Sequence, residues 1–326
     1  MSANRLIKHL PEQLQVAILI MRQYRSVNGK HLNVFSPRTF NEKVQVRKLF
    51  DRRRQLTEWA DKYRVREYVS RMLGPAVLPT LYHVTTDPSD IPFERLPQKY
   101  VIKATHGSGW TCVVQDGSRI NQQQIISCCK AWLDTNYYAL TGEWVYKSIT
   151  PRIIVEEFLD SGAGSVPSDY KFFVFGGKVK FIQVDVNTPQ EWGRDIYDTE
   201  WKRIDCRLGR RENLKRPIAR PESLDTMIAY AETLSGGIDF VRVDLYEIHG
   251  KVYFGELTCT PANGFHTFRP ALWDRTFGNY WEMRFLSGTC RSLLMKKGIG
   301  GQGRRSLVEI GIARQASRFY QRVFSR

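Results

Sequence analysis

Two acidic residues on neighbouring segments have the types and the spacing to hold a metal ion. Segments 239–248 and 251–259 form an expected hairpin, and they carry Asp244 and Glu256. Arg242 lies two residues before Asp244, so both side chains fall on one face of their strand. A carboxylate in an otherwise apolar strand is costly unless it is paired or binds a cation. The pair predicts a Mg²⁺ site between phosphates, and the alternative is a salt bridge from Arg242 to Glu256 on an exposed sheet face.

A lysine followed by a glycine-rich turn has the pattern of a phosphate-binding loop. In YVIKATHGSGWTCVV, an expected strand carries Lys103 and is followed by Gly107, Ser108 and Gly109. Glycines allow backbone N–H groups to approach phosphate oxygens, and Lys103 adds a compact positive charge. The P-loop pattern is absent, and a strand follows the turn where a P-loop has a helix. An ordinary hairpin with a surface lysine is the alternative interpretation.

Two glutamates end a third expected strand, in RIIVEEFLD. Glu156 could accept a hydrogen bond from an adenine amino group, and the backbone after it could pair with the edge of the ring. Phe158 and Leu159 would then supply apolar walls. The alternative is a strand that ends in solvated glutamates.

The composition is typical of a globular protein of enzyme size. The 326 residues are 42% hydrophobic and 12% aromatic, which predicts a substantial core and two or three lobes. The first twenty residues favour a helix over a signal peptide, and no apolar run is long enough for a spanning helix. Six cysteines without a C-x-x-C pair are typical of a reduced cytoplasmic protein. The net charge of +16 suits nucleic acid, acidic sugars, phosphates or an anionic membrane alike.

Hydrophobic periodicity and turn residues divide the chain into helices and strands. We expect helices up to about residue 24 and over 40–72, 121–140 and 222–234. We expect strands over 77–84, 100–105, 110–116, 152–159, 169–175, 178–187, 239–248 and 251–259. Turns at 176–178 and 249–251 join the strands on either side of them into hairpins.

The last residues, from about 298 onward, differ from the rest of the chain in composition. A glycine-rich link begins at residue 298 and leads to a predicted helix in which Arg314, Arg318, Arg322 and Arg326 recur every four residues. This helix could pack on the body of the protein with solvated arginines. It could equally lie as a basic amphipathic helix on an anionic membrane surface.

Taken in order, these motifs resemble those of the ATP-grasp superfamily. The segments FNEKVQVRKLFDRR, ADKYRVREYV, VIKATHGSG, SDYKFFVFGGK and FGELTCTP resemble the TupA-like (teichuronopeptide biosynthesis) branch in particular, over roughly residues 40–268. The resemblance implies an α+β ATP-grasp fold, in which antiparallel sheets of two lobes clasp ATP. We expect a helical N-terminal substrate lobe over 1–98, a small lobe with the glycine loop over 99–160, a large lobe with the metal site over 161–297 and a glycine-linked basic amphipathic helix over 298–326.

Carried over position by position, the resemblance assigns residues to the nucleotide. Lys62 would contact it from the N-terminal lobe, and Lys103 would hold the α- and β-phosphates. The loop from His106 to Gly109 would cover the phosphates, and Asp169 would bind the ribose hydroxyls. The nucleotide-binding set is Lys62, Lys103, His106, Gly107, Ser108, Gly109, Glu156, Glu157, Phe158, Leu159 and Asp169.

The resemblance also assigns metal ligands and catalytic residues. The metal ligands would be Asp244, Glu256 and Thr258. The family usually has Asn where this chain has Thr258, and a hydroxyl is a poorer ligand than an amide oxygen, so the choice between one and two Mg²⁺ ions stays open. Lys171 could reach phosphate or an acidic substrate. Arg242 and the backbone N–H near Gly264 would stabilise the oxyanion.

The activity that the resemblance implies is a carboxylate–amine ligase, which uses ATP and Mg²⁺ to form an amide through an acyl phosphate. Its partners would be an amino acid or other amine and a carboxylate-bearing sugar or glycan of a bacterial cell-surface polysaccharide. The protein would work in the cytoplasm or at the inner face of the membrane, and nucleic acid is not an expected partner. Two alternatives stay open: an ATP-grasp phosphotransferase acting on a sugar, and a non-catalytic protein that binds acidic glycans.

Overall fold

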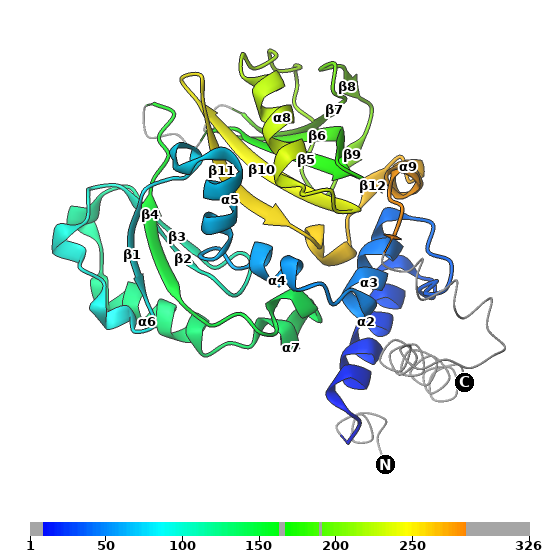
Figure 1. Ribbon diagram of the computed structural model, residues 1–326, viewed down its shortest axis with the longest axis horizontal. Helices are drawn as coiled ribbons and strands as arrows, with labels where there is room; N and C mark the ends of the chain where they lie inside the picture. Colours follow the sequence, from blue (N-terminus) through cyan, green and yellow to red (C-terminus); the bar gives the residue numbers. More distant parts are fainter. Residues whose placement is uncertain (1–8, 163–166, 189–190, 285–326) are drawn as a thin grey trace.

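Two antiparallel sheets form the centre of the fold. The computed structural model describes residues 9–162, 167–188 and 191–284 (Figure 1). The smaller sheet has the strand order β1-β4-β2-β3, and the larger sheet has the order β11-β10-β5-β6-β7-β8. In Figure 1 the two sheets lie on either side of the helices α4 and α5. Helices together with separate antiparallel sheets confirm the predicted α+β class.

The strands have the following bounds: β1 (Leu81–Thr85), β2 (Tyr100–Ala104), β3 (Thr111–Val114), β4 (Ile153–Glu157), β5 (Asp169–Phe175), β6 (Lys178–Asn187), β7 (Trp192–Tyr197), β8 (Arg203–Ile204), β9 (Arg207–Leu208), β10 (Phe240–Ile248), β11 (Lys251–Thr258) and β12 (Phe268–Arg269). The strands β9 and β12 pair with each other in a short ribbon.

The described helices have the following bounds: α2 (Glu12–Asn28), α3 (Phe40–Phe50), α4 (Arg54–Ala60), α5 (Val65–Leu73), α6 (Gln122–Leu133), α7 (Tyr137–Thr141), α8 (Leu224–Leu234) and α9 (Leu272–Tyr280). Short 3₁₀ helices are η1 (Pro75–Val77), η2 (Pro88–Asp90), η3 (Phe93–Arg95), η4 (Gly117–Arg119), η5 (Trp144–Tyr146) and η6 (Pro261–Gly264). None of the described helices is long and apolar enough to cross a membrane.

The alternation of side chains along β5 gives the larger sheet two different faces. Phe172 points into a core that includes the apolar side of α8. Phe173 points the other way, into a second core shared with α3 and α9. Asp169 and Lys171 lie on the same face as Phe173, closer to the start of the strand. This second face is therefore apolar under the helices and polar next to them.

The prediction of one helix over 40–72 is wrong, because two aspartates divide the segment into α3, α4 and α5. Asp51 ends α3, and its carboxylate accepts a hydrogen bond from the backbone N–H of Arg53 (3.2 Å). Asp61 ends α4 and accepts one from the N–H of Tyr63 (2.9 Å). Such side-chain bonds compete with the helix for its backbone donors. The second break places Lys62 outside a helix.

The other predicted elements have mixed outcomes. Every predicted strand is present, and α8 confirms the helix over 222–234. The helix over 121–140 is divided into α6 and α7, because Asn136 caps α7 by accepting from the N–H of Ala139 (3.0 Å). The strands β7, β8, β9 and β12 were not predicted. The helix predicted over 298–326 lies outside the described residues.

Asp239 joins the N-terminal helices to the strand that carries Asp244. Its buried carboxylate accepts hydrogen bonds from Arg47 (2.8 Å), Arg53 (2.6 Å) and the indole of Trp281 (2.7 Å). We expect Asp239→Asn to lower the free energy of unfolding by about 3 kcal/mol, because it removes one of the two carboxylates that neutralise the buried Arg47 and the half-buried Arg53, and leaves only Asp51. Glu200→Gln, in an exposed pair with Lys202, is the matched control and should leave the free energy of unfolding nearly unchanged. Equal stabilities of the two variants in urea denaturation would contradict this role.

Candidate active site

A cavity of about 270 Å³ lies between the two sheets. Its walls come from β2, β3 and β4 of the smaller sheet, from β5, β10 and β11 of the larger sheet, and from the segment around α5. The lining residues are Lys62, Arg66, Pro79, Lys103, Gly109, Thr111, Glu156, Asp169, Lys171, Asp244, Tyr246, Phe254, Gly255 and Glu256. The structure thus brings together most of the residues predicted for the phosphates, the metal and the ribose.

Lys103 and Glu156 face each other on neighbouring strands of the smaller sheet. The ammonium group of Lys103 is bonded to the Glu156 carboxylate, and Arg66 of α5 lies 3.5 Å from its other oxygen. Glu156 is buried. A buried carboxylate needs such cationic partners, so Glu156 holds Lys103 and Arg66 at the cavity wall.

Lys62 connects the break between α4 and α5 to the glycine loop. Its backbone N–H lies 3.4 Å from the carbonyl oxygen of Thr105, and its ammonium group donates to the carbonyl oxygen of Gly107. Burial lowers the pKa of Lys62, although Glu256 opposes the shift. The side chain thus places a poorly solvated cation beside the loop.

The loop from His106 to Gly109 is fitted tightly against an aromatic side chain. A Cβ atom at Gly107 would lie 2.6 Å from Trp110, so a larger residue there forces the loop to move. Gly109 has a φ of +79°, which favours glycine, and it lines the cavity. Ser108 is exposed. Of the four loop residues, Gly109 is the one that lines the cavity.

His106 is turned away from the cavity. Its Nε2 atom lies 3.0 Å from the carbonyl oxygen of Trp132 at the end of α6, and its ring packs against Trp110. Burial lowers the pKa of His106, so the neutral ring is favoured. The side chain anchors the start of the loop, while its predicted contact with the nucleotide stays a prediction.

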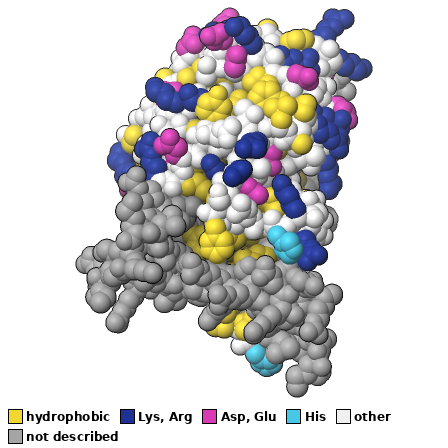
Figure 2. Space-filling model, turned by 90° about the vertical axis from the view of Figure 1, so that its right-hand side faces the viewer, with side chains coloured by type: hydrophobic (Ala, Val, Ile, Leu, Met, Phe, Trp, Pro, Cys, Tyr) yellow, Lys and Arg dark blue, Asp and Glu magenta, His cyan; other side chains and the backbone are white. Residues whose placement is uncertain are grey.

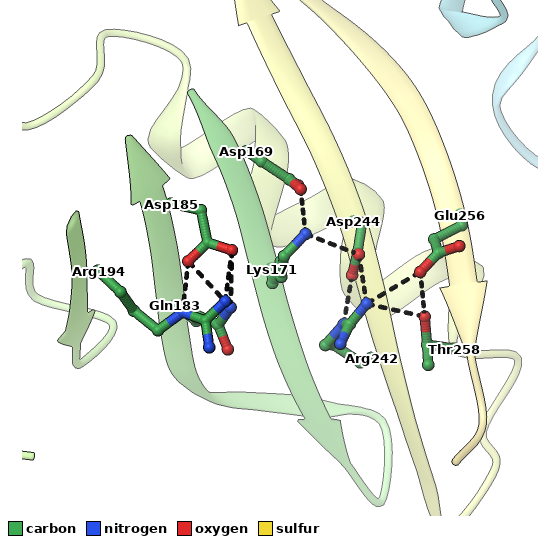
Figure 3. Close-up of polar contacts among 9 residues, drawn as sticks. All are labelled: Asp169, Lys171, Gln183, Asp185, Arg194, Arg242, Asp244, Glu256 and Thr258. Carbon is green, nitrogen blue, oxygen red and sulfur yellow. Dashed lines mark hydrogen bonds and ion pairs between the residues drawn. The ribbon is translucent and has the colours of Figure 1, made fainter. Parts of the chain in front are cut away.

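A row of charged side chains crosses the larger sheet (Figure 3). Asp244 and Glu256 are direct partners in the register of β10 and β11. The Arg242 guanidinium donates to both oxygens of Asp244 (2.7 and 2.6 Å), to Glu256 (2.9 Å) and to the hydroxyl of Thr258 (3.0 Å). The salt bridge considered as an alternative is therefore present, but it lies on the cavity side, where Arg242 is buried.

The row continues from β10 to β5. Lys171 donates to Asp244 (3.1 Å) and is also bonded to Asp169. Burial raises the pKa of Asp169 to about 6, with Lys171 opposing the shift and Asp244 adding to it. Burial alone would raise the pKa of Glu256 as well, but Arg242 and other cations hold it at about 2. Glu256 is thus a permanent anion at this wall.

The two carboxylates fit a magnesium ion that phosphate oxygens help to hold. Within the described residues, no group of three or more His, Cys, Asp and Glu side chains could hold a metal without other ligands. Asp244 and Glu256 supply hard oxygen ligands, and Mg²⁺ usually takes one or two carboxylates together with phosphates and water. Thr258 donates to Oε1 of Glu256 (2.7 Å), so its hydroxyl orients that carboxylate. Its predicted role as a third ligand stays a prediction.

Besides Arg242, Thr258, His106, Gly107 and Ser108, four more predicted site residues lie outside the cavity lining. Glu157 accepts hydrogen bonds from the backbone and hydroxyl of Thr80 (both 2.9 Å), which ties β4 to the entry of β1. Phe158 is buried and Leu159 is half-buried beyond the end of β4. Gly264 lies in the turn η6 with a φ of +72°, where its carbonyl oxygen accepts from Gln45 of α3 (3.1 Å).

Some residues of the cavity were not predicted, although two of them had a sequence signal. Arg66 follows Lys62 by four residues, a spacing at which two side chains meet on one helical face. Gly255 interrupts the strand pattern before Glu256, and a glycine in a strand often marks a bulge. The structure has an irregular register there, between Asp244 and Leu245. Thr111, Pro79 and Phe254 line the cavity without such a signal.

Comparison with known proteins places these features in a family. A family model described as TupA-like ATP-grasp matches residues 42–282. The D-alanine–D-alanine ligase from Bacillus anthracis, solved with ATP, aligns at 14% identity over 75% of this chain and 69% of that chain, with a TM-score of 0.41. An L-amino acid ligase from Bacillus licheniformis aligns at 14% identity over 78% and 57% of the two chains, with a TM-score of 0.43. No curated protein matches the chain. Because these TM-scores are low, the assignment of the chain to a family rests on the family model.

The tight fit of Gly107 gives a test of the loop. Gly107→Ala places a Cβ atom 2.6 Å from Trp110, and overpacking of this kind costs about 1–3 kcal/mol. We expect the affinity for Mg·ADP, measured by calorimetry, to fall about tenfold as the loop moves. The control is Gly117→Ala, whose Cβ atom would have its nearest neighbour at 3.4 Å. An unchanged affinity for Mg·ADP in folded Gly107→Ala protein would contradict the assignment of this loop to the nucleotide site.

Proposed function

Because the chain belongs to the TupA-like ATP-grasp family, we propose that it is an ATP- and Mg²⁺-dependent ligase that joins a carboxylate to an amine. The proposal is supported chiefly by one observation. Lys62, Lys103 and Gly109 line the same cavity as the charged row with Asp244 and Glu256. Cations and a glycine loop on one wall, with the buried Asp244 and the partly exposed Glu256 on the other, suit a nucleoside triphosphate with its metal.

The proposed reaction has two steps. An oxygen of the substrate carboxylate attacks the γ-phosphorus of ATP, ADP leaves, and an acyl phosphate forms. The nitrogen of the amine then attacks the acyl carbon, the carbon–nitrogen bond of the amide forms, and phosphate departs with the former carboxylate oxygen. The amine gives up a proton in this step. Neither step needs a nucleophile from the protein, so positioning and charge stabilisation carry the catalysis.

Different residues would bind the phosphates, stabilise the transferred phosphoryl group and hold the metal ion. Lys103, held by Glu156 on the smaller sheet, and Lys62, in the break between α4 and α5, would bind the α- and β-phosphates. Arg242 and Lys171 would stabilise the negative charge that spreads over the transferred phosphoryl group. Magnesium, held by Asp244 and Glu256, would supply further positive charge to the phosphate oxygens.

The rest of the nucleotide would follow the wall of the smaller sheet. The end of β4 after Glu156 offers backbone groups for the adenine edge, and Asp169 would accept from the ribose hydroxyls. Oδ1 of Asp169 is buried and has no hydrogen-bond partner among the described residues, so it is free to accept one. The other oxygen is already bonded to Lys171.

The proposed substrates are an amino acid or other amine and a carboxylate-bearing sugar of a cell-surface polysaccharide. The net charge of +16 supports an anionic substrate. Among the described residues on the face shown in Figure 2, Lys and Arg side chains stand in several groups, with acidic and uncharged side chains between them. Separate basic groups of this kind suit local contacts with small acidic groups.

Substitution of the two acids tests the metal assignment. We expect Asp244→Asn and Glu256→Gln each to lower Mg·ATP turnover at least about a hundredfold, because each removes a charged oxygen ligand while it preserves side-chain volume. The control is Glu247→Gln, on the same strand β10 but outside the cavity lining. Circular dichroism would check that all three variants are folded. Wild-type turnover in either of the first two variants would contradict the assignment.

A phosphate-release screen tests the reaction class. The full chain is incubated with Mg·ATP and with amino acids and uronic acids, singly and in pairs, and the products are analysed by mass spectrometry. We expect phosphate release that requires both a carboxylate and an amine, together with a dehydrated conjugate of the two. ADP formation with a sugar alone, and a phosphosugar as product, would indicate a phosphotransferase and would contradict the ligase.

A further inference from the structure

The polar face of the larger sheet continues beyond the cavity onto β6 and β7. Asp185 of β6 is the register partner of Asp169, and Arg194 of β7 is the register partner of Asp185. The Arg194 guanidinium donates to both oxygens of Asp185 (2.5 and 2.7 Å), as Figure 3 shows. Trp192 precedes Arg194 by two residues, so it lies on the same face of β7. A continuous polar row therefore leads from the cavity wall to the start of β7.

Both carboxylate oxygens of Asp185 are fully hydrogen-bonded, whereas the buried amide oxygen of Gln183 has no partner among the described residues. Gln183 donates to both carboxylate oxygens of Asp185 (3.1 and 3.2 Å), and Arg194 donates to the same two atoms. The remaining nitrogen of Arg194 donates to the carbonyl oxygen of Leu208 (3.0 Å). These bonds fix the side chains of β6 and β7 in place.

The segment after β9 folds back against β7 and is held there. A Cβ atom at Gly193 would lie 2.7 Å from Leu214, so glycine allows the close packing of that buried leucine. The backbone N–H of Arg194 donates to the carbonyl oxygen of Glu212 (2.9 Å). The segment thus carries Arg211 to a defined position over the start of β7.

Arg211 and Trp192 form a platform at this position, which we name the Trp192–Arg211 platform. The guanidinium carbon of Arg211 lies 4.7 Å from the centroid of the Trp192 ring. Trp192 is 57% exposed, although large aromatic side chains are usually covered. Nη1 of Arg211 is buried and has no hydrogen-bond partner among the described residues. Arg211 also lies near enough to Asp185 to interact with it electrostatically, but that acid is already saturated.

The surroundings of the platform are basic. Residues 207–216 contain five Lys or Arg residues and one acidic residue, Glu212. Glu212 is paired with Arg207, while Arg210, Lys215 and Arg216 are exposed. An exposed aromatic ring beside an incompletely bonded guanidinium, in a basic segment, suits a ligand that has both an apolar face and an anionic group.

We propose that the Trp192–Arg211 platform binds one uronate unit of the acidic glycan substrate, with the pyranose ring against Trp192 and the carboxylate at Arg211. This inference rests on the proposed ligase function. The carboxylate held by Arg211 is not the one that reacts, because the platform on β7 lies two strands away from β5 and outside the cavity lining; another unit of the same glycan would reach the nucleotide along the polar row. The chemistry fits, because a guanidinium pairs with a carboxylate through two parallel hydrogen bonds and an indole ring offers a flat apolar surface.

The binding test uses the full chain with Mg²⁺ and a non-hydrolysable ATP analogue. The probes are D-glucuronate, D-galacturonate and tri-galacturonate, with D-glucose as the neutral control and oligo(U) as the nucleic acid, measured by calorimetry and saturation-transfer NMR. We expect a uronate probe to bind more tightly than glucose. We expect Trp192→Ala and Arg211→Ala each to weaken that binding about tenfold or more, as truncation of central binding residues does. Arg211→Lys should bind the uronate more tightly than Arg211→Ala but more weakly than wild type, because lysine lacks the planar guanidinium group.

The controls separate this proposal from the ligase proposal. Arg210→Ala removes an exposed neighbouring charge and should leave uronate binding within about twofold of wild type. Affinity for the ATP analogue should be the same in all variants, since the platform lies outside the cavity lining. Uronate binding that depends on Trp192 and Arg211 would support the platform even if no amide product is found. No uronate binding by the wild type, binding that both alanine variants retain, or binding of oligo(U) alone would overturn the platform.

Discussion

The position of Arg242 between two carboxylates is the interaction on which the site depends. Asp244 and Glu256 are register partners on adjacent strands, and Arg242 is hydrogen-bonded to both. Without it, two like charges would lie side by side at a largely buried wall, and their mutual repulsion would favour protonation of one of them. With it, the pKa of Glu256 stays at about 2. The sheet can therefore present hard anionic oxygens to a metal ion at neutral pH.

The fold holds this pair opposite a cationic wall. The break after α4, which Asp61 produces, places Lys62 against the glycine loop. The Asp239 carboxylate ties α3 and the start of α4 to the beginning of β10, the strand of Arg242 and Asp244. The helices thus fix the two sheets relative to each other. Within the larger sheet, the same polar face extends to Arg194 on β7, so one surface connects the nucleotide cavity to the proposed sugar platform.

Local patterns predicted the parts of the site that local structure determines. The turn at 249–251 joins the strands of Asp244 and Glu256 into a hairpin, and the strand–turn pattern identified Lys103 and its glycines. The irregular register at Gly255, which the turn does not set, brings Glu256 opposite Asp244. The roles of residues adjacent in sequence were harder to predict, because side chains in a strand alternate between its two faces. Glu157 follows Glu156 but bonds to Thr80 on the far side. Arg66 follows Lys62 by four residues, but its contact with Glu156 depends on how α5 packs against β4, which that spacing does not determine. The strand β7 has the adjacent charged residues Arg194 and Asp195 at its centre, and this pair left no hydrophobic period to detect.

The most direct test of the central claim is a crystal structure of the full chain with Mg²⁺ and a non-hydrolysable ATP analogue. The account predicts phosphate density in the cavity between Lys103 and Arg242, with a metal ion bound to Glu256 or Asp244. It also predicts that Lys103 turns from Glu156 toward the phosphates. A nucleotide bound elsewhere, or phosphates in the cavity with no metal contact to either carboxylate, would contradict it.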